Sequence, residues 1–184
     1  MRRGTITCFL GSMKSSKTSE LLKVLDQSKF RSDVQYACLI RPQLDTRDFV
    51  SRTVKTDNSY DVLTCSRFLM EIYSQLSKYS LICIDEGHFL LDLGPVANRL
   101  ALQDKEVYIA ALNGDSDMRP WDSISNLIPY CDYIERTSGV CECCGKNKPT
   151  FTFYKGVKDG QIVIGDTSYN IYCKSCWEKN AKEI

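Results

Sequence analysis

The chain has 184 residues, 43% of them hydrophobic, and a formal net charge of +1. This length fits one medium-sized domain, or one such domain with a small appendage, and the composition supports a buried core. The 24 lysines and arginines nearly balance the 23 aspartates and glutamates, which argues against nucleic acid or an anionic membrane as the main partner. Because we find neither a signal peptide nor an apolar run as long as a bilayer span, we expect a cytoplasmic protein without a membrane partner.

The first predicted strand, residues 5–10, is almost continuously apolar, as expected in a parallel sheet that is buried on both faces. A helix is predicted over residues 17–30, with Phe30 on its buried face. Between them lies a loop that reads Gly11-Ser12-Met13-Lys14-Ser15-Ser16-Lys17-Thr18. A strand, a tight loop and a helix in this order predict a phosphate-binding loop, because main-chain N–H groups and the helix N-terminus attract anionic oxygens.

Two side chains at the end of this loop carry the expected chemistry. Lys17 is predicted to reach the β- and γ-phosphates of a nucleotide, and the hydroxyl of Thr18 is predicted to bind Mg²⁺. One residue departs from the common pattern, since Ser16 stands where a glycine usually precedes the lysine. A surface turn rich in serine and lysine is therefore the alternative interpretation of the loop by itself.

Strands and helices continue to alternate after the first helix. Further strands are predicted over residues 34–40, 61–64, 81–84, 107–112 and 133–136. Helices are predicted over residues 66–79, 95–102 and 121–128. This alternation is typical of parallel βαβ units with right-handed crossovers, and it predicts an α/β fold in which helices flank a parallel sheet with a phosphate-binding loop (P-loop).

Two adjacent carboxylates, Asp85 and Glu86, follow the strand predicted over residues 81–84. An acidic residue at such a strand end is the usual partner of a phosphate-binding loop, where it holds Mg²⁺ directly or through water. The second carboxylate can take the proton from an attacking hydroxyl. Because adjacent residues of an extended strand point in opposite directions, we expect different roles for the two; a pair of solvated acids is the alternative. The single histidine, His88, is more typical of a packing or hydrogen-bonding group than of a catalytic one.

After Gly139 the sequence changes to cysteine-rich hairpins, with strands predicted over residues 151–154, 161–164 and 170–172. We therefore predict one domain over residues 1–139 and a smaller one over residues 140–184. Two Cys-x-x-Cys pairs in the second domain predict a structural zinc site, because four thiolates complete the tetrahedral coordination of this ion. Four free thiols or two disulfides are the alternatives. The proposed ligands are Cys141, Cys144, Cys173 and Cys176.

Together these stretches resemble the type II thymidine kinases, the family of cellular thymidine kinases that is shared with poxviruses and many bacteria. The loop is similar to the family's G-P-M-F-S-G-K-S-T-E-L, and Asp85-Glu86-Gly87-His88-Phe89 to its D-E-G-Q-F. Asp45-Thr46-Arg47 is similar to D-x-R, and Ala110-Ala111-Leu112-Asn113-Gly114 to A-A-L-D-G. The cysteine pairs, with Ile164-Gly165-Asp166 and Tyr169 between them, resemble a zinc-anchored lasso that closes over the nucleoside.

The resemblance implies a homotetrameric enzyme that transfers the γ-phosphate of ATP to the 5′-hydroxyl of thymidine, with Mg²⁺ and Zn²⁺ as cofactors and no nucleic-acid partner. It implies that Glu86 is the catalytic base. It assigns to the ATP site Gly11, Ser12, Met13, Lys14, Ser15, Ser16, Lys17, Thr18, Arg47, Asp85 and His88. It assigns to the thymidine site Met13, Phe89, Ile164, Gly165 and Tyr169.

Several positions depart from the family pattern. Ser12 and Lys14 replace proline and an aromatic residue in the loop, and His88 replaces glutamine. Ser116 stands where the family has the aromatic residue that packs on the base. Loss of that stacking is expected to weaken nucleoside binding by roughly ten- to a hundredfold, unless Trp121 or Phe89 substitutes.

Three alternatives to a thymidine kinase are kept, the first of them because of Ser116. One is a deoxynucleoside kinase that accepts deoxyuridine or another deoxynucleoside. A second is a P-loop ATPase whose zinc-ribbon module binds nucleic acid or a protein. A third is a decayed homologue that only binds nucleotide, although the presence of Lys17, Thr18, Asp85 and Glu86 argues against it.

Overall fold

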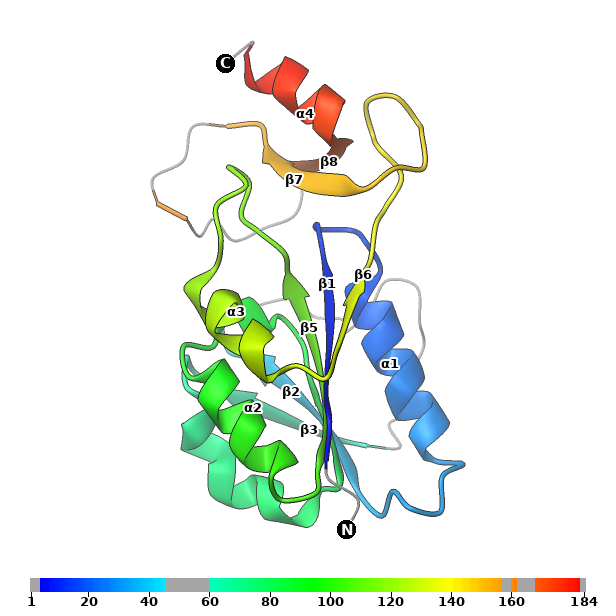
Figure 1. The fold of residues 1–184 in the computed structure, drawn as a ribbon, viewed down its shortest axis with the longest axis vertical. Helices are drawn as coiled ribbons and strands as arrows, with labels where there is room; N and C mark the ends of the chain where they lie inside the picture. Colours follow the sequence, from blue (N-terminus) through cyan, green and yellow to red (C-terminus); the bar gives the residue numbers. More distant parts are fainter. Residues whose placement is uncertain (1–3, 46–59, 157–159, 162–167, 183–184) are drawn as a thin grey trace.

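The computed structural model describes residues 4–45, 60–156, 160–161 and 168–182 (Figure 1). In this part of the chain a six-stranded sheet has the order β3-β2-β4-β5-β1-β6, and every pairing in it is parallel. Its strands are β1 (Ile6–Gly11), β2 (Ala37–Pro42), β3 (Asp61–Cys65), β4 (Leu81–Ile84), β5 (Glu106–Leu112) and β6 (Tyr133–Arg136). The predicted α/β fold with a parallel sheet is confirmed.

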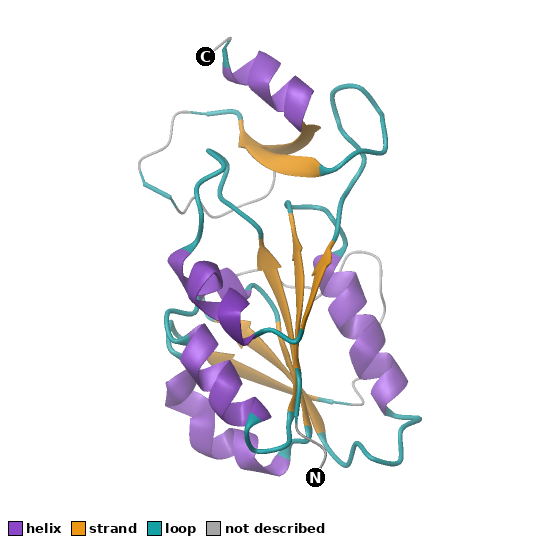
Figure 2. Ribbon diagram, in the orientation of Figure 1, coloured by secondary structure: helices purple, strands orange, loops and turns teal. Residues whose placement is uncertain are grey.

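Helices cover both faces of this sheet (Figure 2). Helix α1 (Lys17–Ser28) lies on one face, and its leucines pack there with Phe9. The opposite face carries η1 (Leu69–Lys78), α2 (Leu93–Ala101) and α3 (Asp122–Leu127), which pack with Cys8 and Leu10. Because β1 alternates between these two layers, all six of its residues are buried. Two short 3-10 turns, η2 (Gly87–Phe89) and η3 (Ile128–Tyr130), complete this layer.

Two details of the helices differ from the sequence-based expectation. Helix α1 ends at Ser28, and Phe30 is 82% exposed because it lies beyond the amphipathic part of the helix. The segment predicted as an amphipathic helix over residues 66–79 is a 3-10 helix, η1. Its buried residues include Leu69 and Leu76 as the periodicity predicted, but the helix is wound more tightly than an α-helix.

Side chains from neighbouring elements hold both ends of η1. At its start, the carboxylate of Asp92 accepts hydrogen bonds from the main-chain N–H groups of Leu69 and Met70, at 2.7 and 2.9 Å. At its end, the buried ammonium of Lys105 donates to the carbonyl oxygens of Ser77 and Tyr79, at 2.9 and 2.6 Å. These groups satisfy the main-chain donors and acceptors that a helix leaves unpaired at its ends.

The C-terminal part of the chain forms a separate small module. Strands β7 (Thr150–Tyr154) and β8 (Tyr169–Cys173) pair antiparallel, and α4 (Lys174–Ala181), which the sequence did not predict, follows β8 directly. Figure 1 shows this module above the upper ends of β1 and β6. The strand predicted over residues 161–164 falls largely outside the described residues. Within the described ranges, no helix combines the length and the apolar character needed to cross a membrane.

Candidate active site

The phosphate-binding loop follows the C-terminal end of β1 and leads into α1, as predicted. Lys17 is buried, and its ammonium donates to the carbonyl oxygen of Ser12 at 2.6 Å. The hydroxyl of Ser15 donates to the same oxygen at 2.8 Å. A Cβ atom on Gly11 would collide with the side chains of Ser15 and Thr137, so the tight curl of the loop requires glycine at its start.

The loop tolerates serine at position 16 at a conformational cost. Ser16 caps α1 with a φ of 65°, in the left-handed region that glycine adopts more readily. Its carbonyl oxygen accepts a hydrogen bond from the N–H of Glu20 at 3.0 Å, so the first turn of α1 still closes. Helix α1 therefore begins directly after Ser16 although the glycine is absent.

Asp85 connects the end of β4 to this loop. The hydroxyl of Thr18 lies 3.0 and 3.1 Å from the two carboxylate oxygens of Asp85, which is 1% exposed. The N–H of Asp85 donates to the carbonyl oxygen of Ile40 at 3.0 Å, and the N–H of Glu86 donates to the Asp85 carboxylate at 3.0 Å. A hydroxyl and a carboxylate are oxygen ligands of the kind that Mg²⁺ prefers, so these two residues fit that ion.

Glu86 does not lie on the strand. Strand β4 ends at Ile84, and Glu86 has a φ of 49° at the start of η2. The prediction that Asp85 and Glu86 point in opposite directions as neighbours on an extended strand is therefore wrong. Glu86 itself adopts the left-handed conformation. The side chain of Glu86 is 19% exposed, and its Oε2 lies 3.6 Å from Nδ1 of His88.

His88 occupies a buried aromatic cluster next to Glu86. Its ring centroid is 4.1 Å from that of Phe89 and 4.8 Å from that of Trp121, at the start of α3. The N–H of Leu112, the last residue of β5, approaches Nδ1 at 3.4 Å. The resemblance assigned Phe89 to the thymidine site, and Phe89 and Trp121 were named as substitutes for a missing stacking residue. Their contact with His88 was not predicted.

The loop that carries Ser116 is folded back on itself. One carboxylate oxygen of Asp115 accepts hydrogen bonds from the N–H groups of Asp117 and Arg119, both at 2.8 Å. Ser116 is 6% exposed, so its side chain offers little surface to a ligand. Within the described part of the chain, the second oxygen of Asp115 and the indole N–H of Trp121 are buried without a hydrogen-bond partner.

The four predicted zinc ligands converge in the C-terminal module. The sulfur atoms of Cys141, Cys144, Cys173 and Cys176 all lie within 4.8 Å of one another. None of the ten cysteines, which all lie in described segments, forms a disulfide. Cys143 is exposed and stands outside the cluster. The convergence of four sulfurs on one point fits the tetrahedral thiolate coordination that zinc prefers.

Hydrogen bonding prepares part of this cluster for metal binding. Bonds from the Ser175 hydroxyl and the Cys176 N–H lower the pKa of Cys173 to about 6. Burial opposes ionisation of Cys141, but N–H groups of Cys144, Cys173 and Cys143 outweigh it and lower the pKa of this thiol. The neighbouring Cys173 sulfur, as a hydrogen-bond acceptor, raises the pKa of Cys176. Thiolates are the metal-binding form of cysteine, so the cluster is chemically suited to a cation.

The module is bonded directly to the phosphate-binding loop. The hydroxyls of Ser12 and Thr150 lie 2.8 Å apart, and the N–H of Met13 donates to the Thr152 hydroxyl at 3.1 Å. The ammonium of Lys14 donates to Glu142 at 3.0 Å. These contacts were not predicted, although the alternating threonines of β7 and the polar residues at positions 12 and 14 are compatible with them.

The remaining predicted site residues divide into two groups. Met13 and Phe89 are half-buried, and Tyr169 is buried with its ring 4.9 Å from that of Tyr154. The other predicted contacts lie outside the described residues; they are Arg47, Ile164 and Gly165. The assignments of all six residues to the ATP and thymidine sites remain predictions.

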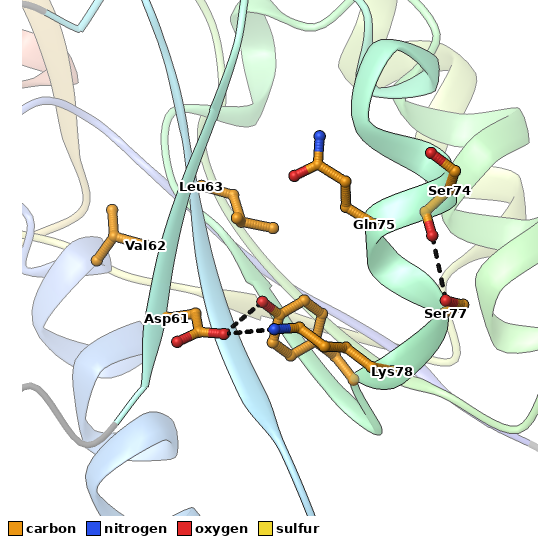
Figure 3. Close-up of a pocket in the computed structure, with 8 residues that line it drawn as sticks. Asp61, Val62, Leu63, Ser74, Gln75, Ser77 and Lys78 are labelled. Atoms are coloured by element: carbon orange, nitrogen blue, oxygen red, sulfur yellow. Dashed lines mark hydrogen bonds and ion pairs between the residues drawn. The ribbon is translucent and has the colours of Figure 1, made fainter.

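A groove of about 520 Å³ lies elsewhere, between β3 and η1 (Figure 3). At this groove the Asp61 carboxylate accepts hydrogen bonds from Tyr79 at 2.6 Å and from Lys78 at 3.0 Å. Asp61 begins β3, whereas the phosphate-binding loop follows the end of β1. Because all strands of this sheet run in the same direction, the groove lies toward the opposite ends of the strands. It is therefore separate from the candidate active site.

Comparison with known proteins places the chain among nucleoside kinases. The sequence profile described as thymidine kinase matches residues 4–177. A thymidine kinase of vaccinia virus (strain Ankara) is 28% identical over 179 residues, which cover 96% of this chain and 98% of the relative. Thymidine kinase 1 of Dictyostelium discoideum is 29% identical over 185 residues, which cover 98% of this chain and 80% of the relative.

A solved structure supports the fold alone. The ATPase DotB of Legionella pneumophila aligns with a TM-score of 0.51 at 14% sequence identity. The alignment covers 99% of this chain and 49% of that protein, so the chain spans about half the length of this structural neighbour.

Proposed function

The chain belongs to the thymidine kinase family, and we infer that it transfers the γ-phosphate of ATP to the 5′-hydroxyl of thymidine. The observation that supports this function most directly is the contact between Thr18 and Asp85, which joins the phosphate-binding loop to the loop after β4. Phosphoryl transfer is catalysed mainly by positioning and by electrostatic stabilisation. These two loops carry side chains suited to both tasks.

The phosphates of ATP are held by the loop that begins at Gly11. Its main-chain N–H groups and the ammonium of Lys17, which exchanges the carbonyl oxygen of Ser12 for phosphate oxygens, compensate the anionic charge. Thr18 and Asp85 would hold Mg²⁺, which when bound neutralises charge between the β- and γ-phosphates. Arg47 is expected to steady the phosphates from a segment outside the described residues.

Glu86 is the proposed base. Its carboxylate is partly exposed next to Asp85, where it can accept the proton of the 5′-hydroxyl as that oxygen attacks phosphorus. Nδ1 of His88 lies 3.6 Å from Oε2 of this carboxylate, and the His88 ring itself packs against the rings of Phe89 and Trp121. We therefore assign His88 to the support of Glu86 in addition to its predicted place in the ATP site.

The nucleoside is proposed to bind between the aromatic cluster and the C-terminal module. Phe89 is half-buried in that cluster and Met13 in the loop, and Tyr169 is buried in the module, where its ring packs with that of Tyr154. Ile164 and Gly165 are expected to contact the base through their main chain. The burial of Ser116 in a self-contained loop favours a second candidate, a kinase that accepts deoxyuridine or another deoxynucleoside.

Zinc, oligomeric state and domain boundary belong to the same proposal. The four thiolates would hold Zn²⁺, which when bound supplies a structural centre for the module. The separate β7–β8 sheet supports a boundary between residues 1–139 and 140–184. A homotetramer located in the cytoplasm is expected from the family.

The experiment that tests this function is phosphate transfer from ATP to a panel of nucleosides, with and without Mg²⁺. We expect Mg²⁺-dependent formation of dTMP, with thymidine preferred. Equal or better transfer to other deoxynucleosides would instead support the kinase with altered base specificity and would implicate the loop around Ser116. Binding of ATP without transfer to any nucleoside would contradict the proposal and favour an ATPase or a decayed kinase.

A further inference from the structure

Lys14 occupies an unusual position in the phosphate-binding loop. Its φ is 55°, and its ammonium points away from the loop to the C-terminal module, where it donates to Glu142 at 3.0 Å and to the carbonyl oxygen of Tyr169 at 2.9 Å. The loop carries a second lysine, Lys17, which is buried and points inward. The two lysines of this loop therefore serve different partners.

Glu142 extends this contact into β8. Its second carboxylate oxygen accepts a hydrogen bond from the N–H of Ile171 at 3.1 Å, and its own N–H donates to the carbonyl oxygen of Ile171 at 2.9 Å. Lys14 thus holds β8 at the carbonyl of Tyr169 directly and at Ile171 through Glu142. One ammonium group is therefore linked to two positions of β8, Tyr169 and Ile171.

We propose that Lys14 is a positioning residue, which sets the place of Tyr169 relative to the phosphate-binding loop and thereby the affinity for the nucleoside. The proposal rests on the function proposed above, since Tyr169 is assigned there to the nucleoside. It goes beyond the family pattern, which has an aromatic residue at position 14. A charged donor on a main-chain carbonyl is a strong and directional hydrogen bond, so it determines position well.

The remaining contacts keep the module attached when Lys14 is replaced. Ser12 and Met13 bind Thr150 and Thr152, and the main-chain N–H of Gly139 also donates to Thr150 at 3.1 Å. The side chains of Lys14 and Glu142 are 32% and 35% exposed, and ion pairs with that exposure contribute little to stability. A variant at position 14 is therefore expected to fold and to retain the metal.

The kinetic test compares Lys14→Met, Glu142→Gln and the double variant. We expect Lys14→Met to raise the KM for thymidine about tenfold, as expected for loss of a charge-assisted hydrogen bond, with a much smaller change in kcat. The double variant is expected to be no worse than Lys14→Met, because both changes break one linkage. Lys14→Arg should restore most of the affinity. Lys148→Met, which changes an exposed lysine of the C-terminal module, is the matched control.

A second measurement does not depend on activity. In the metal-loaded protein without substrates, hydrogen–deuterium exchange of main-chain amides in residues 168–173 should be faster in Lys14→Met than in the unmodified protein and in Lys148→Met, at equal zinc content. Unchanged exchange, or independent effects of the two substitutions on KM, would overturn the proposal. Loss of zinc from Lys14→Met would also overturn it, because the residue would then be required for folding of the module. Altered exchange in a protein that phosphorylates no nucleoside would retain the positioning role and reject the proposed function.

Discussion

Glu86 leaves the extended conformation two residues after the end of β4, and this local change gives adjacent carboxylates different environments. Asp85 is buried against Thr18, whereas Glu86 remains partly exposed beside His88. A buried carboxylate bonded to a hydroxyl suits a metal ligand, and a partly exposed one suits proton transfer. At this scale the division of roles that we propose rests on one residue in the left-handed region.

Replacement of Glu86 by glutamine is the direct test of the base. Glu86→Gln should lower kcat by roughly two to four orders of magnitude, because the amide cannot accept the proton, while the affinity for ATP changes little. Initial rates at saturating substrates and equilibrium binding of ATP measure the two quantities. Glu135→Gln, at an exposed position of β6, is the control. Full activity of Glu86→Gln would remove this residue from the mechanism.

At the scale of elements, polar anchors join the edge strand β3 to η1. Tyr79, one residue after η1, and Lys78, its last residue, both donate to the carboxylate of Asp61 at the start of β3. These two hydrogen bonds, with that from Tyr79 the stronger influence, lower the pKa of Asp61 from its ordinary value of 3.8. The ionised carboxylate is therefore the form that binds the helix.

The pH dependence of stability tests this anchor. Because the folded-state pKa of Asp61 is lowered, its contribution is fully present above about pH 4 and is lost as the pH falls through the folded-state value. The difference in the free energy of unfolding between the unmodified protein and Asp61→Asn should therefore shrink as the pH falls below 3.8. Urea denaturation from pH 6 to pH 2.5 measures it, at ~1 pH unit intervals.

A partner substitution checks the assignment. Tyr79→Phe removes the donor with the largest effect on the Asp61 carboxylate, so Asp61→Asn in this background should show a weaker pH dependence. A difference in stability that stays constant across this pH range would show that Asp61 does not titrate with an altered pKa.

At the scale of the whole molecule, the six-stranded sheet carries the loop that we propose binds the phosphates, and the smaller sheet is hydrogen-bonded to this loop. The two parts have separate hydrophobic clusters, and that of the module is centred on Phe153 and Tyr172. The indole N–H of Trp177 donates to the carbonyl oxygen of Thr152 at 3.0 Å, and Thr152 lies on β7, the strand that contacts the loop. This small cluster alone buries little apolar surface, so a bound cation is expected to contribute much of the stability of the module.

Replacement of one thiolate should unfold the C-terminal module and leave the six-stranded sheet folded. Cys173 ends β8 and directly precedes α4, so Cys173→Ser should release zinc and unfold the module, while the six-stranded sheet still unfolds cooperatively. Zinc content by atomic absorption and the denaturation profile measure both effects. Cys143→Ser changes an exposed neighbouring thiol and should retain the metal. An unchanged zinc content in Cys173→Ser would contradict the four-thiolate site.

The sequence by itself determined the features that depend on short-range pattern. Apolar runs and helical periodicity predicted the strands and most helices, because burial of one face imposes a local repeat. The phosphate-binding loop and the two Cys-x-x-Cys pairs were predictable for the same reason, since their chemistry requires residues at fixed short spacings. The helix over residues 66–79 was predicted by its apolar residues, but its 3-10 form and the contacts of Asp92 and Lys105 with its ends were not.

Only the tertiary structure decided which distant residues meet. Ser12 and Thr150 are 138 residues apart, and Lys14 and Glu142 are 128 apart. Their contacts arise from the order of strands in the sheet and from the seat of the module on the loop, and no local repeat records either arrangement. The same holds for the cluster of His88, Phe89 and Trp121, where two loops converge. Long-range contacts depend on how whole elements pack, so a single sequence carries their residues but not their pairing.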